Sequence, residues 1–115
     1  MTGANIIEKR HFRRIGCHIF SWFKNKADTS VAGLTTTVSE ISEGGVRFHS
    51  SEPLSPSEEY YLFLEIPGRA AIDAYVKPVW SWREPHLKRY ETGACFVHLH
   101  PEDQGSIRTL VSSKL

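Results

Sequence analysis

The stretch EISEGGVRF, residues 40–48, places two short segments with apolar side chains on either side of a glycine pair. Glycine reaches positive φ without steric cost, and the tightest hairpin turns need that conformation. The residues before and after the pair include Ile41, Val46 and Phe48, which are typical of strands. We therefore expect a strand, a tight turn and a returning strand here, with positive φ in the turn.

Similar segments, rich in Val, Ile, Thr, Phe, Tyr and Trp, occur on both sides of this hairpin. They are separated by polar stretches and by turns that contain proline or glycine. We expect strands near residues 15–23, 33–41, 45–49, 58–66, 72–83 and 90–99. The fold class expected from this pattern is mainly β: a small six-stranded antiparallel β-barrel, with an unclosed β-sandwich as the alternative.

A C-terminal α-helix is expected after the last strand. Pro101 suits the first helical position, and two acidic residues follow it in the first turn. Ile107, Leu110 and Val111 then form an apolar stripe at helical spacing. Because the strand near 58–66 is apolar on both faces, we expect this helix to cover its outer face.

One irregularity is expected in the strand near 72–83. Val76 and Val79 do not follow strict alternation, and Pro78 lies between them without a backbone N–H. Proline is found in sheets at edges and bulges. We therefore expect a bulge or a sheet edge at this position.

The chain has 115 residues, which suits a single domain over residues 1–115. We expect a flexible N-terminal arm over about 1–14, the barrel over about 15–100 and the helix over about 101–113. With 40% hydrophobic and 23% charged residues, the composition excludes wholesale disorder. No apolar run is long enough to span a membrane, and only two cysteines occur, so we expect a cytoplasmic protein that does not act at a membrane.

Charge is unevenly distributed along the chain. Residues 1–26 carry six basic side chains and one acidic one, whereas residues 27–65 carry seven acidic side chains and a single basic one, Arg47. A basic N-terminus before an acidic body favours an anionic partner that binds at the start of the chain. Solvation of these charges is the alternative explanation.

Two motifs together resemble the PilZ domain family. Arg10 and Arg14 form an RxxxR motif just before the first expected strand, and Ser42 and Gly45 match the Ser and Gly of a following (Asp/Asn)-x-Ser-x-x-Gly motif. Glu40 stands where the family has Asp or Asn. The resemblance covers about residues 8–112 and includes the expected strands and helix.

The resemblance implies a bacterial receptor for the second messenger cyclic di-GMP, with no other cofactor. Arginine suits such a ligand, because its planar fork binds phosphate oxygens or guanine edges in pairs and stacks on bases. It also implies an arm that becomes ordered on binding and signals to an unidentified protein partner in motility, matrix production or virulence. The expected ligand-binding residues are Arg10, Arg14, Glu40, Ser42, Gly45 and Arg47.

Two other functions remain open. Because Glu40 replaces the Asp or Asn of the motif, one alternative is a degenerate domain that does not bind cyclic di-GMP and acts as a protein-interaction adaptor. The basic N-terminus alone would allow general nucleic-acid binding, but the acidic body would repel a duplex. We expect no nucleic-acid polymer as a partner.

No enzymatic motif is recognisable, so we expect neither catalytic residues nor a metal centre. His98 and His100 would share one strand face, but no further spaced ligand completes a zinc site. The three tryptophans can stack a base or pack within the barrel, and packing is the ordinary role. They are Trp22, Trp80 and Trp82.

Overall fold

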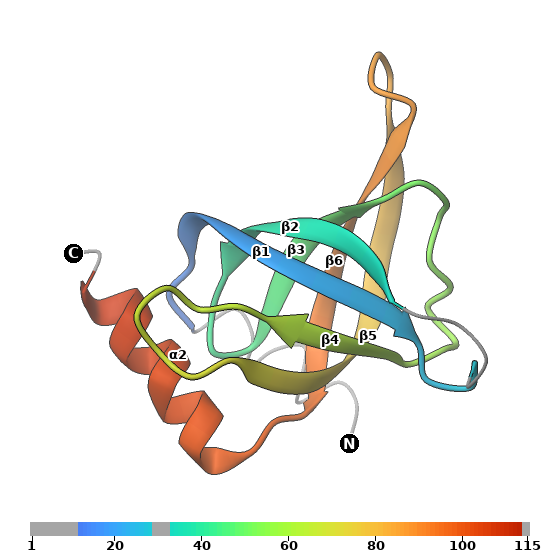
Figure 1. Cartoon of the computed structure of the whole chain (residues 1–115). Coiled ribbons are helices and arrows are strands. Elements are labelled where there is room, and N and C mark those ends of the chain that lie inside the picture. Colours follow the sequence, from blue (N-terminus) through green and yellow to red (C-terminus); the bar gives the residue numbers. More distant parts are fainter. Residues whose placement is uncertain (1–11, 29–32, 114–115) are drawn as a thin grey trace.

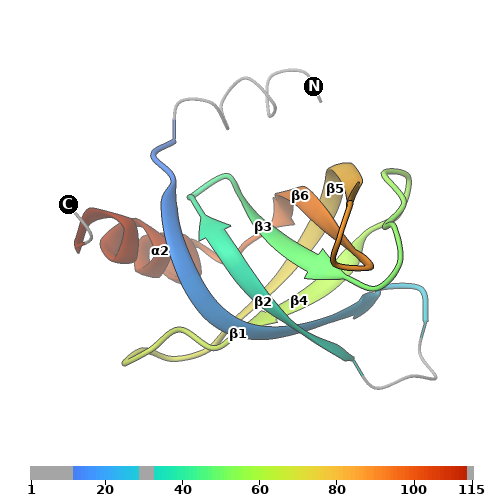
Figure 2. The ribbon, with the colours of Figure 1, turned by 90° about the horizontal axis from the view of Figure 1, so that it is seen from above.

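The computed structural model describes residues 12–28 and 33–113, and in them the chain forms a closed antiparallel β-barrel with one helix. The strands follow one another around the barrel in the order β1-β2-β3-β6-β5-β4 (Figures 1 and 2). This confirms the predicted barrel and rules out the open sandwich. The elements are β1 (Ile15–Asn25), β2 (Leu34–Ile41), β3 (Gly45–Ser50), β4 (Tyr60–Leu64), β5 (Ile72–Glu84), β6 (Arg89–His98) and α2 (Pro101–Ser113).

The barrel interior is filled by alternate side chains of every strand. Val38, Ile41 and Phe48 are completely buried, and Phe48 packs against Phe23 with 5.3 Å between ring centroids. Burial of apolar side chains of this size contributes roughly 1.5–3 kcal/mol each. The two strands of the EISEGGVRF hairpin therefore anchor the core with one face and leave the other face on the barrel surface.

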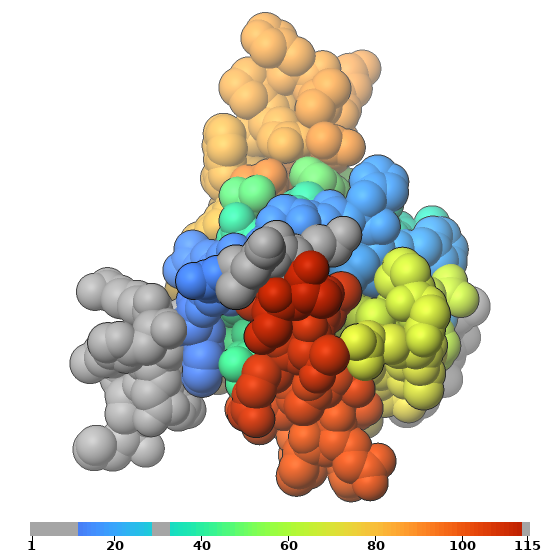
Figure 3. Space-filling model, turned by 90° about the vertical axis from the view of Figure 1, so that its left-hand side faces the viewer, coloured from blue at the N-terminus to red at the C-terminus, as the bar shows by residue number. Residues whose placement is uncertain are grey.

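Helix α2 closes one end of the barrel. Ile107 and Val111 are buried in the same apolar cluster as the strand residues. Arg108, next to Ile107, donates a hydrogen bond to Glu43 in the β2–β3 turn, at 3.0 Å. Figure 3 shows the helix between β1 and the segment that follows β4. The predicted helix is confirmed.

The expectation that this helix covers the outer face of β4 is wrong. The outward rings of Tyr61 and Phe63 pack on Trp22 of β1, with centroids 5.1 and 5.3 Å apart. Tyr61 also contacts Tyr75 of β5, at 5.7 Å. Aromatic side chains on neighbouring strands therefore cover β4. The apolar stripe of the helix packs against the end of the barrel instead.

A bulge interrupts β5 where the sequence predicts one. Pro78 pairs with Ala94 and Trp80 with Gly93, so Val79 is the extra residue on β5. β5 continues well past its last pair with β4, at Val76, and its end forms a projecting hairpin with the start of β6 (Figure 1).

Candidate functional site

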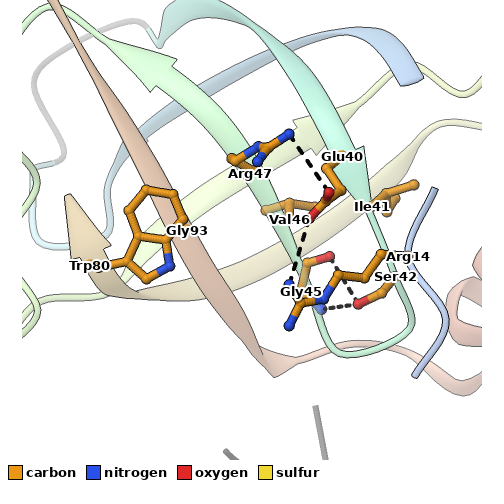
Figure 4. Close-up of a pocket in the computed structure, with 9 residues that line it drawn as sticks. All are labelled: Arg14, Glu40, Ile41, Ser42, Gly45, Val46, Arg47, Trp80 and Gly93. Carbon is orange, nitrogen blue, oxygen red and sulfur yellow. Dashed lines mark hydrogen bonds and ion pairs between the residues drawn. The ribbon is translucent and has the colours of Figure 1, made fainter. Parts of the chain in front are cut away.

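The candidate site is a row of cross-strand neighbours on the outer face of the barrel. Glu40 of β2 pairs with Arg47 of β3, Arg47 with Gly93 of β6, and Gly93 with Trp80 of β5. Residues directly opposite one another in a sheet project from the same face. Figure 4 shows this row together with Arg14, which precedes β1. Four strands and the start of the described chain thus contribute to one surface.

A pocket lies over this row. It brings together five of the six predicted binding residues, which are Arg14, Glu40, Ser42, Gly45 and Arg47. The sixth, Arg10, lies outside the described residues. The pocket is completed by Ile41, Val46, Trp80 and Gly93.

Glu40 lies between the two arginines of the pocket. Its carboxylate is 4.0 Å from Nη1 of Arg14 and 3.6 Å from Nη2 of Arg47 (Figure 4). Half of the Arg14 side chain and about a third of the Arg47 side chain are exposed. Ion pairs this exposed are worth about 0–1 kcal/mol, so an incoming anion displaces them at little cost.

Arg47 also has a hydrogen-bond donor that is not used within the described part of the chain. Its Nε is buried and has no hydrogen-bond partner among the described residues, and the carboxylate of Glu91 lies 3.9 Å from it. A buried donor without a partner costs roughly 1–3 kcal/mol. An acceptor bound in the pocket would relieve that cost, which makes Arg47 suited to an anionic or carbonyl-bearing ligand.

Ser42, which lines the pocket, also shapes the turn between β2 and β3. Its Oγ accepts hydrogen bonds from the backbone N–H groups of Gly44 and Gly45, at 3.1 and 3.2 Å, and the residue is 2% exposed. Its own N–H donates to the carbonyl of Gly45, at 2.9 Å. Ser42 therefore fixes the path of the chain between Glu40 and Arg47.

Gly45 is required for a different reason from the one the sequence suggested. Neither glycine of the turn adopts positive φ, so that expectation is wrong. Instead, a Cβ at Gly45 would lie 2.1 Å from the backbone oxygen of Ala94 on β6. The absence of a side chain lets β3 and β6 approach each other behind the pocket.

Trp80 and Gly93 are two of the four pocket residues that were not predicted from the sequence. A Cβ at Gly93 would lie 2.4 Å from the Trp80 ring, so the indole lies directly over the glycine. The bulge brings Trp80 to the outer face, because strict alternation from Val76 and buried Pro78 would point it inward. The broken alternation around Pro78 was the available signal. Trp80 is 40% exposed, so packing alone does not account for its position.

The other candidates lie elsewhere. Trp22 belongs to the aromatic cover of β4, and Trp82 is exposed on the projecting hairpin. His98 and His100 line a separate depression with Asp103. Within residues 12–28 and 33–113, they are not part of a cluster with the geometry of a metal site.

A charged row lies next to the pocket, nearer the tip of the hairpin. Glu84 accepts a hydrogen bond from Arg89 across the β5–β6 pair. This bond, together with the charge of Arg89 and the nearby His49, lowers the pKa of Glu84 below its ordinary value, although burial opposes the shift. The folded structure thus stabilises the ionised form of Glu84.

Glu84→Gln should destabilise the protein at neutral pH but not in acid. Because the pKa of Glu84 is lower in the folded state than in the unfolded one, its contribution is present above the unfolded pKa and is lost as the pH falls through the folded one. Urea unfolding of both proteins at pH 7 and at about pH 3 measures this. In an Arg89→Ala background the same substitution should have little effect, and an equal loss there would contradict the pairing.

Comparisons with known proteins agree with this fold. The family model described as "PilZ domain" matches residues 8–113. The inhibitor of motility of Bacillus subtilis (MotI/DgrA) superposes with a TM-score of 0.77 at 14% identity, over 91% of this chain and 50% of that one. This chain thus spans about half the length of that protein. No curated protein matches the chain.

Two further structures were determined with a ligand. The PilZ domain of YcgR from Escherichia coli, solved with c-di-GMP, has a TM-score of 0.67 at 12% identity, and the match covers 91% of this chain and 90% of that one. The complex of K. pneumonia MrkH with c-di-GMP has a TM-score of 0.66 at 22% identity, over 91% and 52% of the two chains. At these identities the likeness establishes the fold. In the described part of the chain, no helix is long and apolar enough to cross a membrane.

Proposed function

The chain belongs to the PilZ domain family, and from this premise we propose that it is a receptor module for cyclic di-GMP that binds in the pocket over Glu40, Arg47, Gly93 and Trp80. The observation that carries the proposal is the convergence of Arg14, Arg47 and an exposed indole on one face of the barrel. Arg14, the second arginine of the RxxxR motif, reaches this face from directly before β1, which begins at Ile15.

The ligand chemistry matches the two arginines. Cyclic di-GMP carries two phosphates and two guanines, and guanidinium groups bind phosphate oxygens or guanine O6 and N7 in pairs. Arg14 is exposed enough to turn toward a ligand, and Arg47 offers its unpaired Nε. In the proposed complex Arg10 and Arg14 clamp phosphates and guanines, while Arg47 contacts a phosphate or a base.

Glu40 changes partner in this scheme. In the structure its carboxylate forms long ion pairs with Arg14 and Arg47. When the phosphates take over the arginines, the carboxylate becomes free to accept hydrogen bonds from N1 and N2 of guanine. The longer side chain of Glu40, compared with the aspartate of the family motif, reaches both the arginines and the pocket. Ser42 and Gly45 hold the turn that presents it.

Trp80 provides the stacking surface for one guanine. We expect Trp80→Ala to weaken binding of cyclic di-GMP by roughly 5- to 150-fold, because stacking of a base on an aromatic side chain is worth about 1–3 kcal/mol. Titration calorimetry measures the change. Trp82→Ala is the matched control, since Trp82 lies two residues further along β5 and does not line the pocket. Equal losses in both variants would remove Trp80 from the site.

The signalling step is also part of the proposal. The arm over residues 1–14 becomes ordered around the bound dianion and creates a surface for a protein partner, in a cytoplasmic and non-catalytic role. To change the ratio of ordered to disordered arm from 1:99 to 99:1, the ligand must favour the ordered state by about 5.5 kcal/mol. Several charge-assisted hydrogen bonds, each worth about 1.5–3 kcal/mol, can supply this.

An adaptor that works without ligand is the second candidate. The specific observation in its favour is that Glu40 already pairs with both described arginines of the pocket. An adaptor of this kind would bind its partner equally well with or without nucleotide.

Titration calorimetry of the purified protein with cyclic di-GMP separates the two functions, with GTP and cyclic di-AMP as controls. Saturable binding at micromolar concentration or below, for cyclic di-GMP alone, supports the receptor. No heat and no change in melting temperature with a millimolar ligand contradicts it and leaves the adaptor.

A further inference from the structure

We propose that His49, Glu84 and Glu91 form a binding site for one divalent transition-metal ion of the zinc type. The three residues come from β3, β5 and β6, and they meet on the outer face of the barrel where the projecting hairpin begins. None of them lines the pocket over Glu40 and Trp80. The site therefore lies outside the pocket proposed for cyclic di-GMP, although Arg47 of that pocket is a neighbour of Glu91.

The geometry fits a tetrahedral ion better than a set of hydrogen bonds. Nε2 of His49 lies 3.6 Å from Oε1 of Glu84 and 3.6 Å from Oε2 of Glu91. These separations are too long for good hydrogen bonds. In tetrahedral zinc sites with bonds of 2.0–2.2 Å, ligand atoms lie roughly 3.3–3.6 Å apart. All three donor atoms here fall within 4.8 Å of one another, so small side-chain movements bring them onto one ion.

The three side chains converge because of the strand register. His49 pairs with Glu91 across β3 and β6, so the two project from the same face. Glu91 in turn pairs with Trp82 of β5, and Glu84 follows two residues later on the same face. The ligand positions are therefore fixed by backbone hydrogen bonds of three neighbouring strands.

The donor set matches the charge of a divalent ion. Two carboxylates bring a charge of −2. The neutral imidazole adds a nitrogen donor, which suits zinc and other transition metals, whereas calcium and magnesium take oxygen donors. The three side chains are only 16–18% exposed. Arg89 and Arg47 already lie beside the two carboxylates, and an ion would add a positive charge between them. Three protein ligands leave the fourth position of a tetrahedral ion for water.

The neighbouring arginines both assist the ion and compete with it. Arg89 holds the second oxygen of Glu84, in the manner of the outer-shell partners that orient metal ligands. Arg47 lies 3.9 Å from the Glu91 oxygen that the ion would take. At this distance the contact is not a hydrogen bond, so the ion would replace only a weak interaction of Glu91.

The first test is titration of the chelator-treated protein with Zn²⁺, followed by calorimetry and by melting temperature. We expect one equivalent bound and a rise in melting temperature. His49→Gln should weaken this binding by more than the roughly 10- to 100-fold that loss of an outer-shell partner costs. His98→Gln is the matched control and should bind as the wild type does, since His98 lies outside the cluster. Equal binding by wild type and His49→Gln would overturn the proposal.

A spectroscopic test covers the case in which His49→Gln fails to fold. Co²⁺ bound by the wild type should give the intense visible bands of tetrahedral coordination, and these should disappear in Glu91→Gln, whose side chain keeps nearly the same shape. Circular dichroism confirms that the variant is folded. Bands that persist in folded Glu91→Gln, or one equivalent of Co²⁺ bound without tetrahedral bands, would refute the site.

Discussion

Replacing Arg14 and Arg47 together by alanine should reduce the affinity for cyclic di-GMP by roughly 1,000-fold, because each charge-assisted contact is worth about 2 kcal/mol and the two reach different parts of the ligand. The barrel should stay folded, since both side chains lie on its outer surface and neither belongs to the core. Titration calorimetry gives the affinity, and circular dichroism verifies the fold.

The matched control for this prediction changes the net charge by the same amount. Arg13 and Arg69 are exposed and do not line the pocket, so the double variant Arg13→Ala/Arg69→Ala should bind within about threefold of the wild type. If the control loses as much affinity as the Arg14/Arg47 variant, the ligand is attracted by the overall positive charge of the protein and the pocket is not the site. If the Arg14/Arg47 variant binds normally, the assigned residues are wrong.

Gly45→Ala should destabilise the barrel by about 3 kcal/mol or more, at the upper end of the cost of overpacking. The new Cβ would lie 2.1 Å from the backbone oxygen of Ala94, and a backbone atom within a strand pair cannot move away without breaking the ladder. The melting temperature should fall by roughly 10–20 °C. Thermal unfolding followed by circular dichroism measures this.

Gly105→Ala provides the control for that substitution. A Cβ at Gly105 meets nothing within 4 Å, and the residue lies inside helix α2. Alanine is favoured over glycine in a helix by about 1 kcal/mol, so this variant should be slightly more stable than the wild type. A Gly45→Ala protein as stable as Gly105→Ala would show that β3 and β6 tolerate a wider separation.

The fold was largely readable from the sequence because most strands bury one face. Alternation over segments such as 45–49 predicts both the strands and their buried faces, and the Pro101 helix start is a local signal. The place of α2 could not be predicted in this way. An apolar stripe shows that a helix packs, but not whether it packs on the barrel end or on β4.

The candidate site was only partly readable, for reasons of register. Five predicted residues lie together because the two motifs flank adjacent strands, β1 and the β2–β3 hairpin. Trp80 was missed because a one-residue bulge reverses which face a side chain takes. The cluster of His49, Glu84 and Glu91 was missed because His49 is far in sequence from the two glutamates, and only the pairing of β3 with β6 brings it to them.

The unequal lengths of β4 and β5 leave one strand edge exposed. The last β4–β5 pair is Tyr60 with Val76, yet β5 continues to Glu84 with β6 as its only strand partner among the described residues. A bare edge is a template for sheet growth between molecules, and proteins protect such edges with proline, bulges and charges. Pro78, the bulge beside it and the charged residues Lys77 and Arg83 all fall on this stretch. The features that disturb the regular pairing of β5 are thus the same ones that protect a strand edge against pairing with another molecule.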